Sequence, residues 1–130
     1  MKKTILFAFA LLMCSLMAFT TVKTVANDCE ILHEGTFIYG DSEEVIKVVI
    51  DGENHTEYHN NGKYIIQSKL DWVNDCEYNM TMQKVTIPNF PYEVGDVMNI
   101  KVDKIEGNNI LYTATLKGQK WRSFFVKVEE

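Results

Sequence analysis

The residue types best suited to chemistry lie on one short stretch of the chain. His55, Glu57 and His59 alternate with other residues, so in a β-strand their three side chains point to the same face. Residues two apart on a strand are separated by about 6.8 Å, a spacing at which a pair can share one metal ion. His55 and His59 are too far apart on a flat strand, and no fourth ligand is identifiable. We therefore predict no metal site, and interpret the stretch as a solvated strand beside the Asn61-Gly62 turn.

Elsewhere the sequence offers little for catalysis. It contains neither a Gly-x-Ser-x-Gly motif nor a glycine-rich phosphate loop. Carboxylate pairs such as Glu43-Glu44 fall at turns, where they are solvated or cap the turn. We therefore expect no enzyme and no cofactor.

The first 26 residues have the layout of a secretory signal peptide. Two lysines precede an uncharged apolar run over residues 4–19, and Thr24 and Ala26 stand at the −3 and −1 positions of a cleavage before Asn27. The run is shorter than the roughly 20 residues that a transmembrane helix needs. We expect an exported protein, periplasmic or extracellular, with no membrane span after cleavage. An uncleaved N-terminal anchor is the alternative.

Export changes the charge of the chain. The 130 residues include 13 basic and 18 acidic ones, a net charge of −5. Residues 1–26 contain three of the lysines and none of the acids, so the remaining chain carries −8. Nucleic acid is excluded as a partner, because neutralising phosphates requires clustered Lys and Arg. We expect one domain over residues 27–130, and a small molecule or a protein as its partner.

Three cysteines divide between the two parts of the chain. Cys14 lies inside the apolar run behind Leu12 and Met13, whereas a lipid-attachment site needs a small residue before the cysteine. We therefore interpret it as part of the signal peptide and do not favour a surface lipid anchor. Cys29 and Cys76 remain, and they allow a single intramolecular disulfide in an oxidising compartment. Two free thiols or a metal site are the alternatives, and no close Cys/His cluster supports the metal.

From Gly35 onward, apolar and polar residues alternate between turn residues. The pattern predicts about eight strands, over residues 36–39, 44–50, 55–59, 64–73, 77–87, 97–105, 110–117 and 121–128. Asp51-Gly52 is a strong hairpin signal, and no window after Asn27 keeps helical spacing. The sequence therefore predicts an all-β antiparallel meander. Closure into a small barrel removes exposed strand edges and is favoured, with a two-sheet sandwich as the alternative.

Alternation also assigns side chains to the inside of this barrel. The inner-face residues suited to a small amphipathic ligand are Tyr64, Ile66, Ser68, Tyr78, Met80, Met82 and Tyr112. The alternative is a filled core, because an eight-stranded barrel is just wide enough for side chains to close it. Almost no titratable group is expected on this inner face.

Aromatic residues on the outside suggest an interaction surface. Trp121 and Phe125 are predicted to lie opposite an inward-facing Phe124 on the last strand, and Phe90 and Tyr92 flank them from a proline-containing loop. Together they predict an exposed apolar patch for a partner. A short N-terminal segment held by Cys29 could equally cover it.

Four short motifs carry a resemblance to other proteins. They are Asp28-Cys29, Gly35-Thr36-Phe37, Lys69-Leu70-Asp71-Trp72 and Asp75-Cys76-Glu77-Tyr78. Through them the chain resembles an uncharacterised family of small exported β-rich proteins of Bacteroidota, some of which are mislabelled as DNA topoisomerase IV. The resemblance implies a lipocalin-like barrel and supplies no activity or site. Members are often lipid-anchored, and this chain departs from them in lacking a good lipid-attachment sequence.

Together these features predict an exported, non-enzymatic binding or interaction module for an unknown ligand. The alternative is a small envelope protein with a packed core that acts as an inhibitor or structural partner. A small hydrolase or isomerase in the barrel mouth is disfavoured, because it needs convergent titratable groups. An enclosed cavity above about 300 Å³ would favour small-molecule binding, and convergent carboxylates or histidines in a cleft would favour an enzyme.

Overall fold

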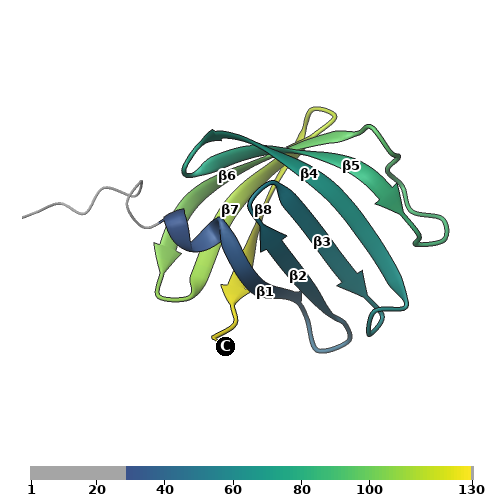
Figure 1. Cartoon of the computed structure of the whole chain (residues 1–130), viewed down its shortest axis with the longest axis horizontal. Coiled ribbons are helices and arrows are strands. Elements are labelled where there is room, and N and C mark those ends of the chain that lie inside the picture. Colours follow the sequence, from purple (N-terminus) through teal and green to yellow (C-terminus); the bar gives the residue numbers. More distant parts are fainter. Residues whose placement is uncertain (1–28, 130) are drawn as a thin grey trace, which may run out of the picture.

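Turn residues separate eight strands along the chain. In the computed structural model these strands form a closed barrel (Figure 1). It describes residues 29–129; the expected signal peptide (1–26) and Cys14 lie outside them. A short 3₁₀ helix, η2 (Cys29–Leu32), precedes the strands. These are β1 (Glu34–Gly40), β2 (Val45–Asp51), β3 (Asn54–His59), β4 (Tyr64–Asn74), β5 (Glu77–Val85), β6 (Val97–Glu106), β7 (Asn109–Leu116) and β8 (Gln119–Lys127).

Each strand pairs antiparallel with the next, and β8 returns to pair with β1. The all-β meander barrel is thus confirmed, and the sandwich is not the fold. No helix within residues 29–129 has the length and apolar character needed to cross a bilayer.

One end of the barrel, which we call the closed end, is covered by η2. Cys29 is bonded to Cys76 in the β4–β5 turn (S–S 2.03 Å), so the predicted disulfide is present. Leu32, at the end of η2, is completely buried among the apolar core residues. The His33 ring stacks on Trp72 with 3.7 Å between ring centroids. These contacts fill the barrel at the end where β1 starts.

At the opposite end, which we call the open end, the strands are joined more loosely. β1 and β8 pair only at Phe37–Lys127 and Ile38–Val126, both in the last residues of β8. β5 pairs with β6 only over Glu77–Thr81, and the β5–β6 loop follows. This loop and the β3–β4 turn lie on the right in Figure 1, away from η2. The open end therefore has room between its strands.

The last strand faces the opposite way from the prediction. Phe125 is buried, with 4% of its surface exposed, whereas Phe124 is 45% exposed. The cause is the two-residue turn at Lys117 and Gly118, both with positive φ (49° and 79°), as in the tight hairpins that match strand twist. This turn pairs the buried Leu116 with Gln119, and Trp121, Ser123 and Phe125 follow on the inner face. An outward Phe125 was therefore wrong, and inward Phe124 with it.

Candidate functional site

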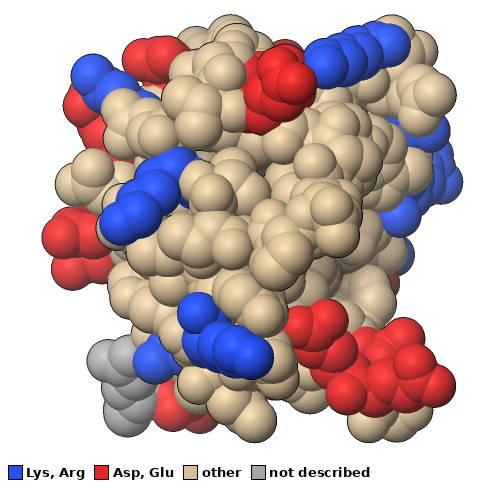
Figure 2. Space-filling view, turned by 90° about the vertical axis from the view of Figure 1, so that its right-hand side faces the viewer, with Lys and Arg blue, Asp and Glu red and all other residues tan. Residues whose placement is uncertain are grey.

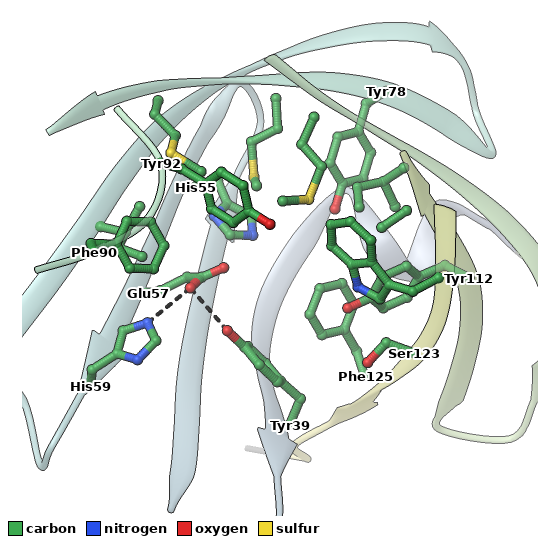
Figure 3. Close-up of a pocket in the computed structure, with 17 residues that line it drawn as sticks. Tyr39, His55, Glu57, His59, Tyr78, Phe90, Tyr92, Tyr112, Ser123 and Phe125 are labelled. Atoms are coloured by element: carbon green, nitrogen blue, oxygen red, sulfur yellow. Dashed lines mark hydrogen bonds and ion pairs between the residues drawn. The ribbon is translucent and has the colours of Figure 1, made fainter. Parts of the chain in front are cut away.

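A cavity of about 160 Å³ opens among the side chains of the open end (Figure 3). It is smaller than the 300 Å³ expected of a site for a drug-sized ligand. A cavity of about 150 Å³ nevertheless holds a molecule of the size of benzene. The site therefore has space for one small molecule.

Most of the cavity wall is apolar or aromatic. The aliphatic and thioether side chains are Ile66, Met80, Met82, Met98, Ile100 and Ala114. The aromatic ones are Tyr39, Phe90, Tyr92, Tyr112, Trp121 and Phe125, with Tyr78 deeper in the barrel. Methionines adapt to ligands of irregular shape, and aromatic rings offer large flat contact surfaces.

Glu57 is the central polar group of the cavity. Its Oε2 accepts a hydrogen bond from the Tyr39 hydroxyl at 3.0 Å and lies 2.9 Å from His59 Nε2 (Figure 3). The other ring nitrogen of His59, Nδ1, is 3.9 Å from Glu44. Both bonds of the Glu57 carboxylate reach Oε2, so Oε1 accepts none from residues 29–129.

Other polar groups of the interior have no partner. His55 is 1% exposed and Tyr78 is fully buried; neither ring nitrogen of His55 nor the Tyr78 hydroxyl has a hydrogen-bond partner within the described chain. The hydroxyl of Ser68, which faces His55 across the β3–β4 ladder, is also buried without a hydrogen-bond partner among these residues. A buried polar group without a partner costs about 1–3 kcal/mol, so three together are unusual for a filled core.

The surroundings fix the charge states of these groups. Burial lowers the pKa of His55 and raises that of Tyr78, so both are neutral at neutral pH. Burial by itself raises the pKa of Glu57, but the hydrogen bonds from His59 and Tyr39 outweigh it, and the pKa lies below its usual value. Burial raises the pKa of Tyr112 to about 12. The cavity therefore holds the Glu57 carboxylate beside an uncharged His55 and an uncharged Tyr78.

Among the described residues that line the cavity there is no lysine or arginine. Figure 2 looks at the open end: the centre of this face is uncharged, Lys and Arg side chains lie to the left of it and below it, and acidic side chains lie mainly toward the outline. Within residues 29–129, no group of three or more His, Cys, Asp or Glu is arranged to hold a metal ion. His55, Glu57 and His59 share one face of β3, as their alternation required, but that face is the barrel interior.

Most of the inner-face prediction agrees with the structure. Ile66, Tyr78, Met80, Met82 and Tyr112 line the cavity. Ser68 is buried behind its wall. Tyr64, the first residue of β4, is half-buried and is not part of the wall.

The predicted aromatic patch is divided. Phe90, Tyr92 and Trp121 line the cavity, with 5.6 Å between the ring centroids of Phe90 and Tyr92. Phe125 lies inside with them rather than on an outer surface. Trp121 is 37% exposed, as predicted, and Phe90 and Tyr92 are half-buried, so these three line the cavity and still reach the surface, whereas Phe125 is enclosed.

The expectation of an inner face almost without titratable groups was wrong. His55 and Glu57 were placed on a solvated strand, but both are buried. The hairpin at Gly52 could have shown that they face inward, because its two-residue turn pairs Ile50 with His55 and Val48 with Glu57. Because Val48 and Ile50 face the core, the residues opposite them must also face inward. Tyr39 and Ser123 were missed as well.

No family model, curated protein or solved structure matches this chain. The function therefore has to be argued from the cavity and its polar groups.

Proposed function

We propose that this protein is an exported, non-enzymatic binding protein that holds one small amphipathic molecule in the open end of its barrel. The observation that carries the proposal is that His55 and Tyr78 line the cavity while their polar side-chain atoms have no hydrogen-bond partner among residues 29–129. A ligand that hydrogen-bonds to them removes the penalty of leaving them unpaired. The apolar wall contributes burial of the rest of the molecule.

Export is part of the proposal. Its support is the signal-peptide pattern of residues 1–26 together with the Cys29–Cys76 bridge, since disulfides persist in oxidising compartments. A packed-core inhibitor or structural protein is less well supported. A protein of that kind should have a filled core, whereas here polar side chains line a cavity.

Native mass spectrometry of protein purified from its own host tests the proposal. We expect a bound small molecule that is lost on unfolding. Met98→Trp places a larger side chain in the cavity and should abolish the retained mass. Val97→Trp makes the matched change on the exposed face of the same strand and should keep it. Equal retention by both variants would contradict a ligand in the cavity.

Acid–base catalysis is a second candidate, favoured by the Glu57–His59 contact of 2.9 Å beside a cleft. A carboxylate held by two hydrogen bonds can act as a general base on a bound substrate. A benzisoxazole, whose ring opening reports proton abstraction by any positioned base, tests this. Turnover that Glu57→Gln abolishes would support the enzyme, and no turnover above buffer would exclude Glu57 as a base for this probe.

A further inference from the structure

The charges of the cavity limit the class of ligand that it can take. Among its lining residues Glu57 is the acid, and no lysine or arginine is present to neutralise it. The adjacent His59 also contacts Glu44, so one imidazole lies between two carboxylates. An anionic ligand would meet a carboxylate without any permanent positive charge, and close like charges repel strongly where water is excluded.

The unused hydrogen-bonding capacity also favours a donor. Oε1 of Glu57 is an acceptor, since an ionised carboxylate has no proton to give. A neutral imidazole has one acceptor nitrogen and one N–H, and a phenol can accept as well as donate, so His55 and Tyr78 add two acceptors and two donors. The Glu57 oxygen only accepts, so acceptors outnumber donors among these unused groups. A group with several N–H bonds and a positive charge matches the Glu57 oxygen and can donate further to a second acceptor. Charge-assisted hydrogen bonds of this kind are about twice as strong as neutral ones.

The wall suits the rest of such a ligand. Aromatic faces attract organic cations, and the cavity presents several, including Tyr112 and Phe125 with 4.6 Å between their ring centroids. An inorganic cation fits poorly. The described residues contain no group of three or more His, Cys, Asp or Glu arranged to hold a metal ion, and the wall is mainly apolar. The space, about 160 Å³, limits the body of the ligand to roughly one ring.

We infer that the open end of this barrel is a site for a small organic cation, a protonated amine on an aromatic or aliphatic body, with its ammonium group directed at Glu57. The inference rests on the proposed binding function and specifies its ligand class. It concerns the charge of the ligand, so it can fail while the binding function holds.

Three probes with the same ring and different charge test it: benzylammonium, benzyl alcohol and benzoate. Each is titrated into the disulfide-bonded protein near neutral pH, with binding followed by calorimetry. We expect benzylammonium to bind about tenfold to a hundredfold more tightly than benzyl alcohol, and benzoate more weakly than both. Equal affinities, or benzoate binding most tightly, would overturn the inference and leave binding in the cavity intact.

Two variants with the same loss of charge locate the effect. Glu57→Gln should bring benzylammonium down to the affinity of benzyl alcohol, while benzyl alcohol itself still binds and so reports a folded cavity. Glu53→Gln removes an exposed carboxylate beside the closed end and should keep the wild-type ranking. If Glu57→Gln does not fold, the order of the three probe affinities on the wild-type protein still tests the inference.

Absence of binding by all three probes at millimolar concentration would also overturn the inference. The retained-ligand experiment judges the proposed function separately, because it makes no assumption about charge. A retained anion would reject the inference and support the function; a retained amine would support both.

Discussion

At the closed end, η2 lies over the barrel, a disulfide holds it there, and Leu32 fills the space beneath it. At the open end, the same strands surround a cavity that extends inward to His55 and Tyr78, whose polar side-chain atoms have no hydrogen-bond partner among residues 29–129. Lys127 adds to the closed end by donating to the backbone oxygens of Ile31 and Glu34 at 2.8 and 2.9 Å. The closed end satisfies its polar groups internally, whereas the open end leaves several for something else to satisfy.

The difference suggests a division of labour along the barrel axis. Stabilising contacts gathered at one end allow the other end to keep groups that lower stability but bind a ligand. Substitutions at the two ends should therefore change different properties. Those at the closed end should lower the free energy of unfolding, and those at the open end should mainly change binding.

Loss of the disulfide should have the largest effect. Cys29 and Cys76 are 47 residues apart, and the loop-entropy relation assigns about 4 kcal/mol to closing such a loop. A Cys29→Ser/Cys76→Ser double variant should lose about that much in urea denaturation. Ligand affinity of the fraction that remains folded should not change. A variant as stable as the wild type would contradict the role given to the closed end.

Leu32→Ala should have the next largest effect. It removes a fully buried side chain beneath η2 and should lower the free energy of unfolding by about 3 kcal/mol. Phe90→Ala is the matched truncation at the open end, where the side chain is only half-buried. It should cost less stability and weaken binding, again measured by denaturation and titration. Equal losses of stability would remove the distinction between the ends.

Two tyrosine-to-phenylalanine variants should shift stability in opposite directions. Tyr78→Phe removes a buried hydroxyl that has no partner, so the free energy of unfolding should rise by about 1 kcal/mol. Tyr39→Phe removes the hydrogen bond to Glu57 and should lower it by about 1–2 kcal/mol. Urea denaturation measures both. A destabilised Tyr78→Phe would mean that the hydroxyl has a partner after all.

Acid should destabilise the open end in two steps. The unfolded chain takes up a proton on His55 as the pH falls through its ordinary pKa of 6.5. The folded ring does not, because burial lowers its pKa by more than the neighbouring Glu57 carboxylate raises it; Ser68 and Tyr78, which also face it, are uncharged. Stability is then lost below pH 6.5, by at most about 1.4 kcal/mol per pH unit. Glu57, whose folded pKa is also lowered, adds a loss below its ordinary 4.5. Denaturation across pH should show a smaller first slope for His55→Leu; an identical slope would refute this.

Local pattern was enough to predict the strands and their order. Alternation and turn residues determine where a strand begins and ends, and eight strands linked by hairpins have few ways to close. The disulfide followed from the count of cysteines after residue 26, where the expected signal peptide ends. What alternation leaves open is which of two faces points inward when both carry large side chains, as on β8 with Phe124 and Phe125.

Hairpin register settles that question, and it depends on the length of each turn rather than on composition. A two-residue turn at Gly52 forces His55 and Glu57 inside, although their polarity suggested solvent. The turn at Gly118 does the same for Trp121 and Phe125. Once the inward-facing residues of one strand are known, the turn lengths identify their partners on the next strand. Applied to β2 and β7, this rule would have identified these residues. The absence of hydrogen-bond partners for His55 and Tyr78 required the three-dimensional structure.

A titration followed by backbone amide chemical shifts tests the central claim most directly. Benzylammonium added to the isotope-labelled protein should move the amide signals of Glu57, Met98 and Ser123, which belong to the cavity. Those of Leu32 and Val102, in the core at the closed end, should stay in place. Shifts of similar size at both ends, or none at saturating ligand, would contradict a barrel that is closed for stability at one end and open for binding at the other.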